Sequence, residues 1–471
     1  MYETCENCIH TPIYNRRQFL TRLGMGFGGL SLAALLSEEA LFAQQADSGF
    51  SPMSPKLPPY PGKAKRVLHI FAQGAPSQVD TWDPKPALHR AQGQPIGDNK
   101  GVAMPSPFKF SKHGQSGIEV SEVFPQLAEH VDEMAVIRSM YTDIPAHEIA
   151  TVMMNTGSRL LSPPKPSLGS WTVYGLGSEN QNMPGFISLH AGGGVPTGGE
   201  ANWGAAFLPG AYQGTSINTQ APSADRMIEN ISNPYVSEKE QRRQLDLVHQ
   251  LNEIHAQTLQ KDAQLEARIE AYEIAFKMQA AASDAFDLSK ESDIVRQAYG
   301  NTDQGRQLLI ARRLLERGVR FVQAWAGGWD HHQDIEVKLP QRAREIDQPL
   351  AALMTDLKQL GMLDSTLVIW GGEFGRTPTR DRGGNATPGR DHNAKGFSLW
   401  MAGGGVKGGT VYGATDEFGA KAVENPVHVH DLHATILNLL GFDHTKLTYR
   451  YNGRDFRLTD VFGNVVKGVV V

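Results

Sequence analysis

GVRFVQAWAGGWDHH, residues 318–332, sets the interpretation of the whole chain. After its first glycine, Val319–Trp325 is rich in β-branched and aromatic residues, which predicts a buried strand. Two glycines then open a loop that carries Asp330 and His332. A carboxylate and an imidazole are costly to bury in a core but are good ligands for hard or borderline metal ions. The stretch therefore predicts a metal-binding loop at the carboxyl end of a strand.

Two other stretches place the same residue types beside a predicted strand. Glu373 follows the apolar run Thr366–Trp370, and His392 precedes the run Phe397–Met401. In open α/β sheets, ligands bind in the crevice beyond the carboxyl ends of the strands. We therefore expect the three stretches to form one site along one edge of a sheet.

The first predicted strand, Val67–Ala72, adds two carboxylates to this expectation, because Asp80 and Asp83 follow it. Carboxylates and imidazoles together hold one or two divalent ions, and these residue types do not distinguish zinc, calcium, magnesium and manganese. The predicted metal ligands are Asp80, Asp83, Asp330, His332, Glu373 and His392.

His147 and Arg376 are the predicted catalytic residues. His147 opens a predicted helix, where it serves as nucleophile, base or additional ligand, or simply bonds to Glu148 or a backbone carbonyl. Arg376 either clamps a substrate oxyanion or solvates its loop. Structural roles also remain open for the carboxylates, since Glu373 could pair with Arg376, and Asp391 could cap a turn or pair with its neighbouring arginine.

Along the chain, buried strands alternate with amphipathic helices, which predicts an α/β domain with a mostly parallel sheet. The 471 residues suffice for one large domain, and the formal net charge of −5 predicts no strong attraction to nucleic acid or anionic membranes. Residues 223–300 are charged and rich in glutamine, and we interpret them as a helical insertion. Leu265, Ile269, Tyr272 and Phe276 would form one face of its helix.

The N-terminal sequence predicts that the protein is exported. Arg16 and Arg17 precede an apolar run from Leu23 to Leu36, the pattern of a twin-arginine signal. We predict the signal at 1–43, a linker at 44–65 and the folded domain at 66–471. The protein would use the twin-arginine export machinery, reach the periplasm or the exterior, and keep no stable membrane span. Both cysteines, Cys5 and Cys8, precede the arginine pair, so the mature domain would have no thiolate chemistry.

The motifs together resemble the bacterial family known as domain of unknown function 1501, from Lys65 to the C-terminus. The resemblance is carried by GAPSQVDTWDPKP at 74–86, GGWDHH at 327–332, GEFGRTP at 372–378, GRDH at 389–392 and AGGGVKGG at 402–409. That family looks like a divergent branch of the alkaline phosphatase and sulfatase superfamily. The resemblance implies a three-layer sandwich with a mostly parallel central sheet.

The same resemblance implies metal ligands at Asp330, His332, Glu373 and His392, and it places the superfamily's nucleophile position on His147. Sulfatases carry cysteine or serine there, in a C/S-x-P-x-R sequence that this chain lacks. The usual formylglycine mechanism is therefore unsupported. The first strand also ends in glutamine and glycine rather than aspartate.

From these observations we expect an exported, divalent-metal-dependent hydrolase of sulfate or phosphate esters, acting on a small molecule or a glycan ester. The alternative is a non-catalytic envelope or surface protein that binds an anionic glycan on the same fold. The missing nucleophile favours the alternative, whereas the Asp, His and Glu clusters favour the enzyme.

Overall fold

The computed structural model describes residues 53–97, 101–192, 196–221, 224–227, 235–258, 269, 272–273, 276–277, 284–383 and 387–471. The predicted export signal and residues 44–52 of the predicted linker lie outside these residues, as do Leu265 and most of 259–283 in the predicted insertion. Within the described residues, none of the helices has the length and apolarity needed to cross a bilayer.

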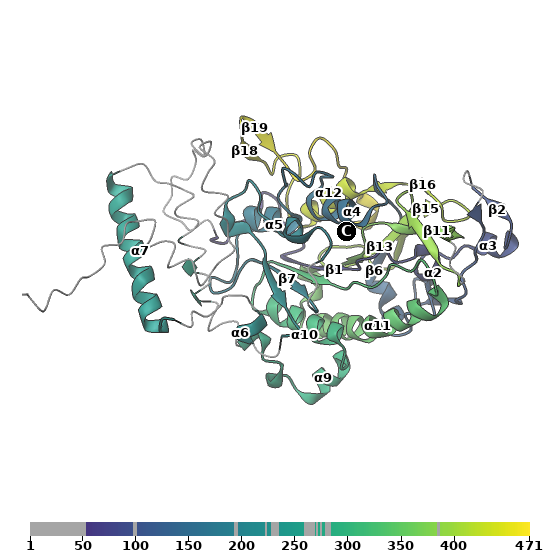
Figure 1. The fold of residues 1–471 in the computed structure, drawn as a ribbon, viewed down its shortest axis with the longest axis horizontal. Coiled ribbons are helices and arrows are strands. Elements are labelled where there is room, and N and C mark those ends of the chain that lie inside the picture. The colour runs from purple at the N-terminus through teal and green to yellow at the C-terminus, as the bar shows by residue number, and fades with distance from the viewer. Residues whose placement is uncertain are drawn as a thin grey trace, which may run out of the picture.

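The fold is built on one large sheet (Figure 1). Its strands are, in spatial order, β14 (Thr410–Tyr412), β6 (Met134–Tyr141), β13 (Phe397–Ala402), β10 (Thr366–Gly371), β1 (Arg66–Phe71), β9 (Phe321–Trp325), β7 (Phe186–His190) and β8 (Thr215–Asn218), with β17 (Val427–His428) beside β6. Every neighbouring pair is parallel except the two that involve β13. The prediction of a mostly parallel sheet is confirmed.

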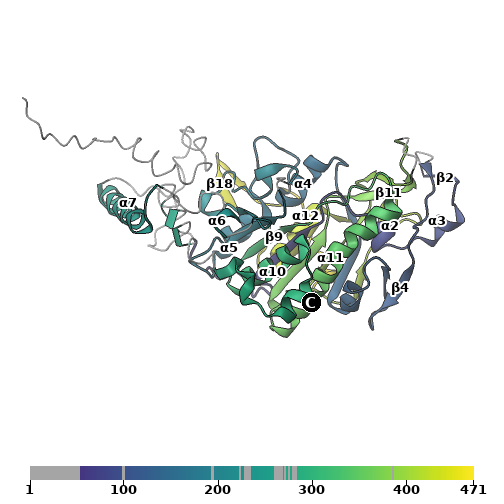
Figure 2. The ribbon, with the colours of Figure 1, turned by 60° about the horizontal axis from the view of Figure 1, so that its bottom comes forward.

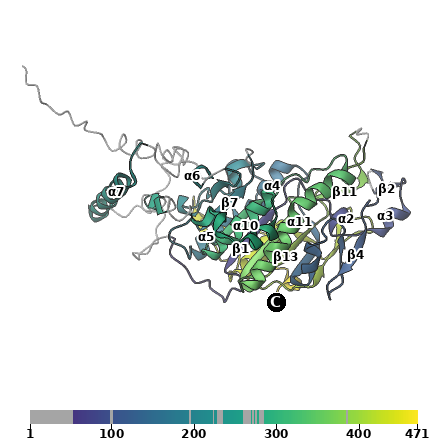
Figure 3. The same cartoon turned by 90° about the horizontal axis from the view of Figure 1, so that it is seen from below.

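Helices cover both faces of the sheet. One face carries α10 (Asp303–Glu316) and α11 (Ile335–Gln359), which lie in front of the strands when the molecule is seen from below (Figures 2 and 3). The other face carries α4 (His147–Thr156), α5 (Leu168–Leu176) and α12 (Val429–Leu439) (Figure 1). The predicted three-layer α/β arrangement is therefore present.

The pleat of the central strand explains why both faces are covered. Leu68 and Ile70 of β1 enter the core beneath α10 and α11, and Val67 and Phe71 enter the core beneath α4, α5 and α12. Successive strand side chains point to opposite faces, so a strand that is apolar at nearly every position needs a layer on each side.

The remaining elements are short or peripheral. They are α2 (Gln78–Thr81), α3 (Pro86–Arg90), β2 (Pro95–Ile96), β3 (Gly101–Val102), β4 (Phe110–His113), β5 (Ile118–Ser121), α6 (Ala224–Met227), α7 (Glu238–Thr258), α9 (Asp293–Tyr299), β11 (Gly375–Arg380), β12 (Arg390–Asn393), β15 (Ala414–Thr415), β16 (Ala422–Glu424), β18 (Tyr449–Tyr451) and β19 (Arg454–Phe456). Among them, the antiparallel ribbon β11–β12 matters most for the site.

Candidate metal centre

Three neighbouring strands end level with one another and deliver the loops of the site. In the parallel registers of the sheet, Phe71 lies beside both Trp325 and Gly371. The loops that follow these strands therefore leave the sheet at one edge. Two of them are joined directly, because the backbone N–H of Gly74 donates to Glu373 Oε1 at 3.0 Å.

Gly74 also brings the loop after β1 against the Asp330 loop, which follows β9. Its φ is +105°, and a Cβ at this position would lie 2.7 Å from the backbone nitrogen of Asp330 and 2.9 Å from that of Trp329. A side chain would clash there, and an L residue would be strained at this φ. The turn after β1 is thus fixed against the Asp330 loop.

Two further elements complete the site. His147 is the first residue of α4, and His392 lies on β12 opposite Arg376 of β11. The predicted helix at His147 is confirmed, and it ends at Gly157, which has a φ of +66°. His392 was expected in a loop before a strand, but it belongs to the ribbon, which folds over the carboxyl edge of the sheet.

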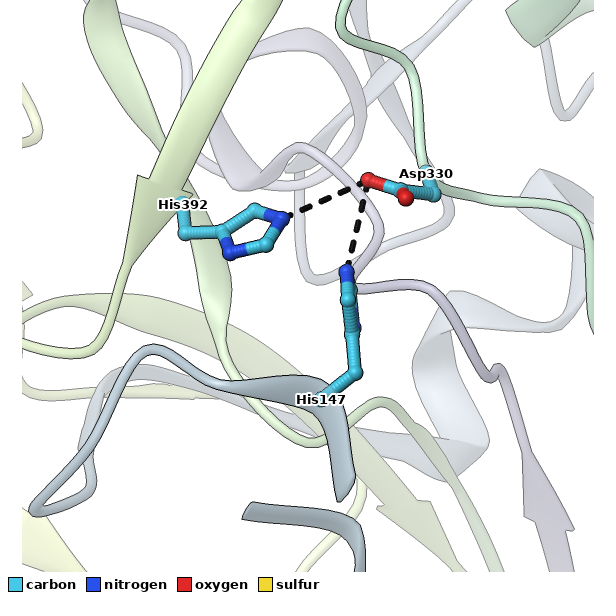
Figure 4. Close-up of side chains that lie close together, drawn as sticks. All are labelled: His147, Asp330 and His392. Carbon is cyan, nitrogen blue, oxygen red and sulfur yellow. Dashed lines mark ion pairs between the residues drawn. The ribbon is translucent and has the colours of Figure 1, made fainter. Parts of the chain in front are cut away.

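The Oδ1 atom of Asp330 is the point on which three imidazoles converge. It lies 3.4 Å from His147 Nε2, 3.0 Å from His332 Nε2 and 3.5 Å from His392 Nε2. Figure 4 shows His147 and His392 approaching the carboxylate from different elements. The Nε2 atoms of His332 and His392 are themselves 2.9 Å apart. We call these four residues the donor group.

Each imidazole of the donor group is held through its other nitrogen. The acceptors of the three Nδ1 atoms are Glu373 Oε1 at 2.6 Å for His147, Asp381 Oδ2 at 2.7 Å for His332 and the carbonyl oxygen of Pro145 at 2.9 Å for His392. Carboxylate and carbonyl oxygens accept hydrogen bonds, so each Nδ1 carries a hydrogen. In all three rings, Nε2 is then the nitrogen directed toward Asp330, where it can take a proton, accept an N–H or bind a metal ion.

The donor group fits a metal ion. The ligand atoms of His147, Asp330 and His392 lie within 4.8 Å of one another, and so do those of His332, Asp391 and His392. The Nε2 atom of His147 is buried and has no hydrogen-bond partner among the described residues. Imidazoles combined with a carboxylate suit zinc and similar transition ions, whereas calcium and magnesium prefer oxygen ligands throughout.

Arg376 is the cation already present beside the donor group. Its side chain is fully buried. Its five N–H groups are directed at protein acceptors, namely the carbonyl oxygens of Gly74, Ala75 and Arg390, the Asp330 carboxylate and His332 Nε2. Since no N–H is left over, we assign Arg376 to holding the donor group rather than to clamping a substrate oxyanion.

Charge within the site shifts two pKa values in opposite directions. Burial disfavours protonation of His147, but its charge contact with Asp330 and its hydrogen bond to Glu373 outweigh this and raise its pKa to about 9. Burial also acts to raise the pKa of Asp330, yet its contacts with His147, His392 and Arg376 hold it far below its ordinary range. Without an ion, a proton therefore occupies His147 Nε2 at neutral pH, and a bound ion would replace it.

The structure sets three predicted ligands apart from the donor group. Asp80 is buried and accepts two hydrogen bonds from Arg390, at 2.6 and 3.0 Å. Asp83 is buried and pairs with Lys85 at 2.9 Å. The short helix α2 directs Asp80 toward the ribbon. Through Arg390, Asp80 holds β12, the strand that carries His392. Glu373 accepts the hydrogen bond from His147 Nδ1, the ring nitrogen that does not face Asp330.

Two residues near the donor group, Asp391 and Asp381, were not predicted as metal ligands or as partners of its imidazoles. Asp391 lay inside the GRDH motif, so an acidic neighbour of His392 was visible in the sequence. Asp381 carried no such signal, since it follows Arg380 in a polar stretch with no strand or motif to mark it. Its contact with His332 depends on how the ribbon folds back, which sequence spacing does not specify.

The fold and the donor group together define an α/β protein with a histidine-rich site at the carboxyl edge of its sheet. The chain belongs to the family described as "Protein of unknown function (DUF1501)", whose sequence profile matches residues 64–470. The family expected from the sequence motifs is thus confirmed. A comparison with curated proteins found no match.

Solved structures similar to this chain include alkaline phosphatases and sulfatases. The PsFucS1 sulfatase from Pseudoalteromonas sp. has a TM-score of 0.36 and 13% identity, over 80% of this chain and 68% of that chain. Alkaline phosphatase from the Antarctic bacterium TAB5 has a TM-score of 0.32 and 10% identity, over 80% and 98% of the two chains. An alkaline phosphatase superfamily protein from Vibrio parahaemolyticus has a TM-score of 0.31 and 13% identity, over 92% and 78%. At such values, what these proteins bind or hydrolyse does not transfer to this chain.

Proposed function

We propose that this protein is a metal-dependent hydrolase of phosphate or sulfate esters, with Asp330, His147, His332 and His392 as its metal ligands. One observation carries the proposal: three imidazoles turn the same nitrogen, Nε2, toward one carboxylate oxygen at 3.0 to 3.5 Å, while an acceptor holds each Nδ1. Nitrogen lone pairs that converge in this way repel one another unless a proton or a metal cation lies among them.

The donor set also supports a choice of ion. Three nitrogen donors and one carboxylate favour zinc, iron or another transition ion that binds imidazole over calcium and magnesium. Such an ion, when bound, polarises an ester oxygen and lowers the pKa of a water molecule beside it.

His147 is better suited to ligation than to nucleophilic attack. Its Nδ1 is bound to Glu373 and its Nε2 points to Asp330, so neither ring nitrogen faces outward for attack. Residues 53–471 contain no cysteine, so a formylglycine made from cysteine is also absent from this domain. We therefore propose direct attack by water: its oxygen bonds to phosphorus or sulfur, the ester bond breaks, and the leaving oxygen takes a proton from solvent and departs as the alcohol.

Asp391 is the carboxylate placed to receive the proton of that water. It is exposed, and its ligand oxygen lies within 4.8 Å of ligand atoms of His332 and His392. Its Oδ1 atom accepts a hydrogen bond from the backbone N–H of His392 at 2.7 Å. An exposed carboxylate at the edge of the donor group can orient a water molecule toward a substrate that approaches from solvent.

The test uses the full domain loaded separately with Zn²⁺ or Mn²⁺ and assayed with p-nitrophenyl phosphate and p-nitrophenyl sulfate. We expect hydrolysis of at least one ester, and background rates for Asp330→Ala with the fold intact by circular dichroism. Asp443→Asn, remote from the donor group, serves as the control and should keep full activity. Metal-loaded protein that hydrolyses neither ester but binds a sulfated glycan would support the non-catalytic alternative.

Export through the twin-arginine machinery remains part of the proposal. It is supported by Arg16 and Arg17 ahead of the apolar run in the sequence. Changing both arginines to lysine should leave the protein in the cytoplasm of the producing bacterium. Fractionation of cells that express the two forms measures this directly, and equal export of both forms would contradict it.

A further inference from the structure

Asp381 lies directly behind one imidazole of the donor group. Its Oδ2 atom is 2.7 Å from His332 Nδ1, and its side chain is only 11% exposed. We propose that Asp381 is a positioning residue, which fixes the ring orientation and tautomer of His332 so that Nε2 faces the ion. This inference rests on the proposed metal centre and adds to it a residue outside the ligand set.

The carboxylate of Asp381 is itself held in place. Its Oδ1 atom accepts the backbone N–H of Gly383 at 2.9 Å, which leaves Oδ2 for His332. The backbone N–H of Asp381 donates to the carbonyl oxygen of Gly389 at 2.9 Å, across the ribbon. The two oxygens therefore have separate partners, and the side chain cannot rotate without losing a bond.

The backbone of the ribbon sets the distance between Asp381 and His332. A Cβ on Gly389 would lie 2.1 Å from the carbonyl carbon of His332 and 2.3 Å from the nitrogen of Gln333. The N–H of Arg390 also donates to the His331 carbonyl at 3.0 Å. Since no side chain fits between them, the ribbon packs directly on the His332 loop.

Two physical effects follow from this arrangement. His332 is one-third exposed, so without a partner at Nδ1 its ring would be free to turn and to place the hydrogen on Nε2. A carboxylate acceptor also makes an imidazole a stronger ligand than a carbonyl acceptor does, because it stabilises the positive charge that develops on the ring. Asp381 therefore selects the ligating form of His332 and strengthens it.

The experiment uses Co²⁺ as the probe, since its visible absorption reports the geometry of its ligands. Affinity is measured by titration of the metal-free full-length protein, and the spectrum is recorded at saturation for wild type, Asp381→Ala, Asp381→Asn and Asp381→Glu. Asp443→Asn is the matched control. The Asp443 carboxylate also accepts a backbone N–H two residues on, from Thr445 at 2.9 Å, but it contacts no imidazole of the donor group.

We expect Asp381→Ala to weaken Co²⁺ binding by about 10- to 100-fold and to shift the absorption bands. Asp381→Asn keeps an acceptor and should lie between Asp381→Ala and wild type, and Asp381→Glu should restore part of the loss. If Asp381→Ala keeps the wild-type affinity and spectrum while His332→Ala weakens Co²⁺ binding and changes the spectrum, the positioning role is overturned. The metal centre would then remain intact. No Co²⁺ binding by wild type would instead overturn the metal centre itself.

Discussion

The Nε2 atoms of His332 and His392 lie 2.9 Å apart, although both rings donate their Nδ1 hydrogen to other groups. Two lone pairs at this distance repel each other unless a proton or a cation lies between them. The contact is therefore favourable only with a proton shared between the two nitrogens or with a cation bound to both, and the second arrangement is the one expected of two metal-ligating imidazoles.

His392→Ala tests this relationship. Removing one imidazole relieves the repulsion, so we expect the melting temperature of the metal-free protein to stay the same or rise. The stabilisation gained on adding Zn²⁺ should disappear in this variant. In wild type, Zn²⁺ at a thousand times its Kd would raise the free energy of unfolding by about 4 kcal/mol. Differential scanning calorimetry with and without Zn²⁺ measures both effects. His89 is exposed, so His89→Ala serves as the control. Equal Zn²⁺ stabilisation of wild type and His392→Ala would contradict the assignment of His392 as a metal ligand.

Glu373→Leu should destabilise the protein even without metal. The Glu373 side chain is fully buried, and its Oε1 accepts from both His147 Nδ1 and the N–H of Gly74. Leucine would leave both donors buried without an acceptor, at a cost of about 3 kcal/mol. Urea unfolding measures this loss. Glu373→Gln keeps an acceptor oxygen and should lose clearly less, so equal losses in the two variants would argue against the hydrogen-bonding role.

The buried pair of Asp80 and Arg390 should show strong coupling. Both side chains are fully buried, and Asp80 accepts two hydrogen bonds from the guanidinium. Asp80→Ala should cost about 3 to 5 kcal/mol, because it leaves a buried charge without its partner. The double variant Asp80→Ala with Arg390→Met should be more stable than Asp80→Ala alone. Additive effects in a double-mutant cycle by urea unfolding would contradict this pairing.

Stability should fall as the pH is lowered from 6.5 toward 4.5. Burial lowers the pKa of His69 to about 4 and that of His433 to about 3, both below the unfolded value of 6.5. In this window the unfolded chain binds more protons than the native protein, so the free energy of unfolding decreases with falling pH. Each histidine contributes up to about 1.4 kcal/mol per pH unit. His69→Leu should reduce the slope by that amount in urea unfolding, and an unchanged slope would contradict it.

Much of the sheet could be predicted from apolar runs. Thr366–Trp370 and Phe397–Met401 are each within one residue of β10 and β13. The direction of β13 could not be predicted, because a strand buried on both faces has the same composition in either orientation. The antiparallel pairing of β13 with β10 and β6 follows from long-range topology.

Helix boundaries were less predictable where proline is present. The helix α11 begins at Ile335 and contains Pro340 and Pro349. Proline removes a backbone donor and normally ends a helix. Here the buried face of α11, which includes Leu339 and Leu350, packs against the sheet and compensates for the lost hydrogen bonds.

The candidate site was partly predictable for a related reason. Asp330 and His332 follow a strand, and the carboxyl edge of a parallel sheet gathers such residues. Asp80 also follows a strand, yet the turn at Gly74 and Ala75, with φ of +105° and +63°, directs it into an ion pair with Arg390. Local strand order predicts which loops meet, but the partners of each side chain depend on the ribbon β11–β12.

The most direct test of the account is the metal content of the purified domain. The protein is incubated with Zn²⁺, passed through a desalting column and analysed by inductively coupled plasma mass spectrometry beside Asp330→Ala and Asp443→Asn. The account predicts about one or two Zn²⁺ per chain in wild type and Asp443→Asn, and a near-complete loss in Asp330→Ala. Zn²⁺ near zero in wild type, or equal Zn²⁺ in Asp330→Ala and wild type, would contradict the donor group as a metal centre.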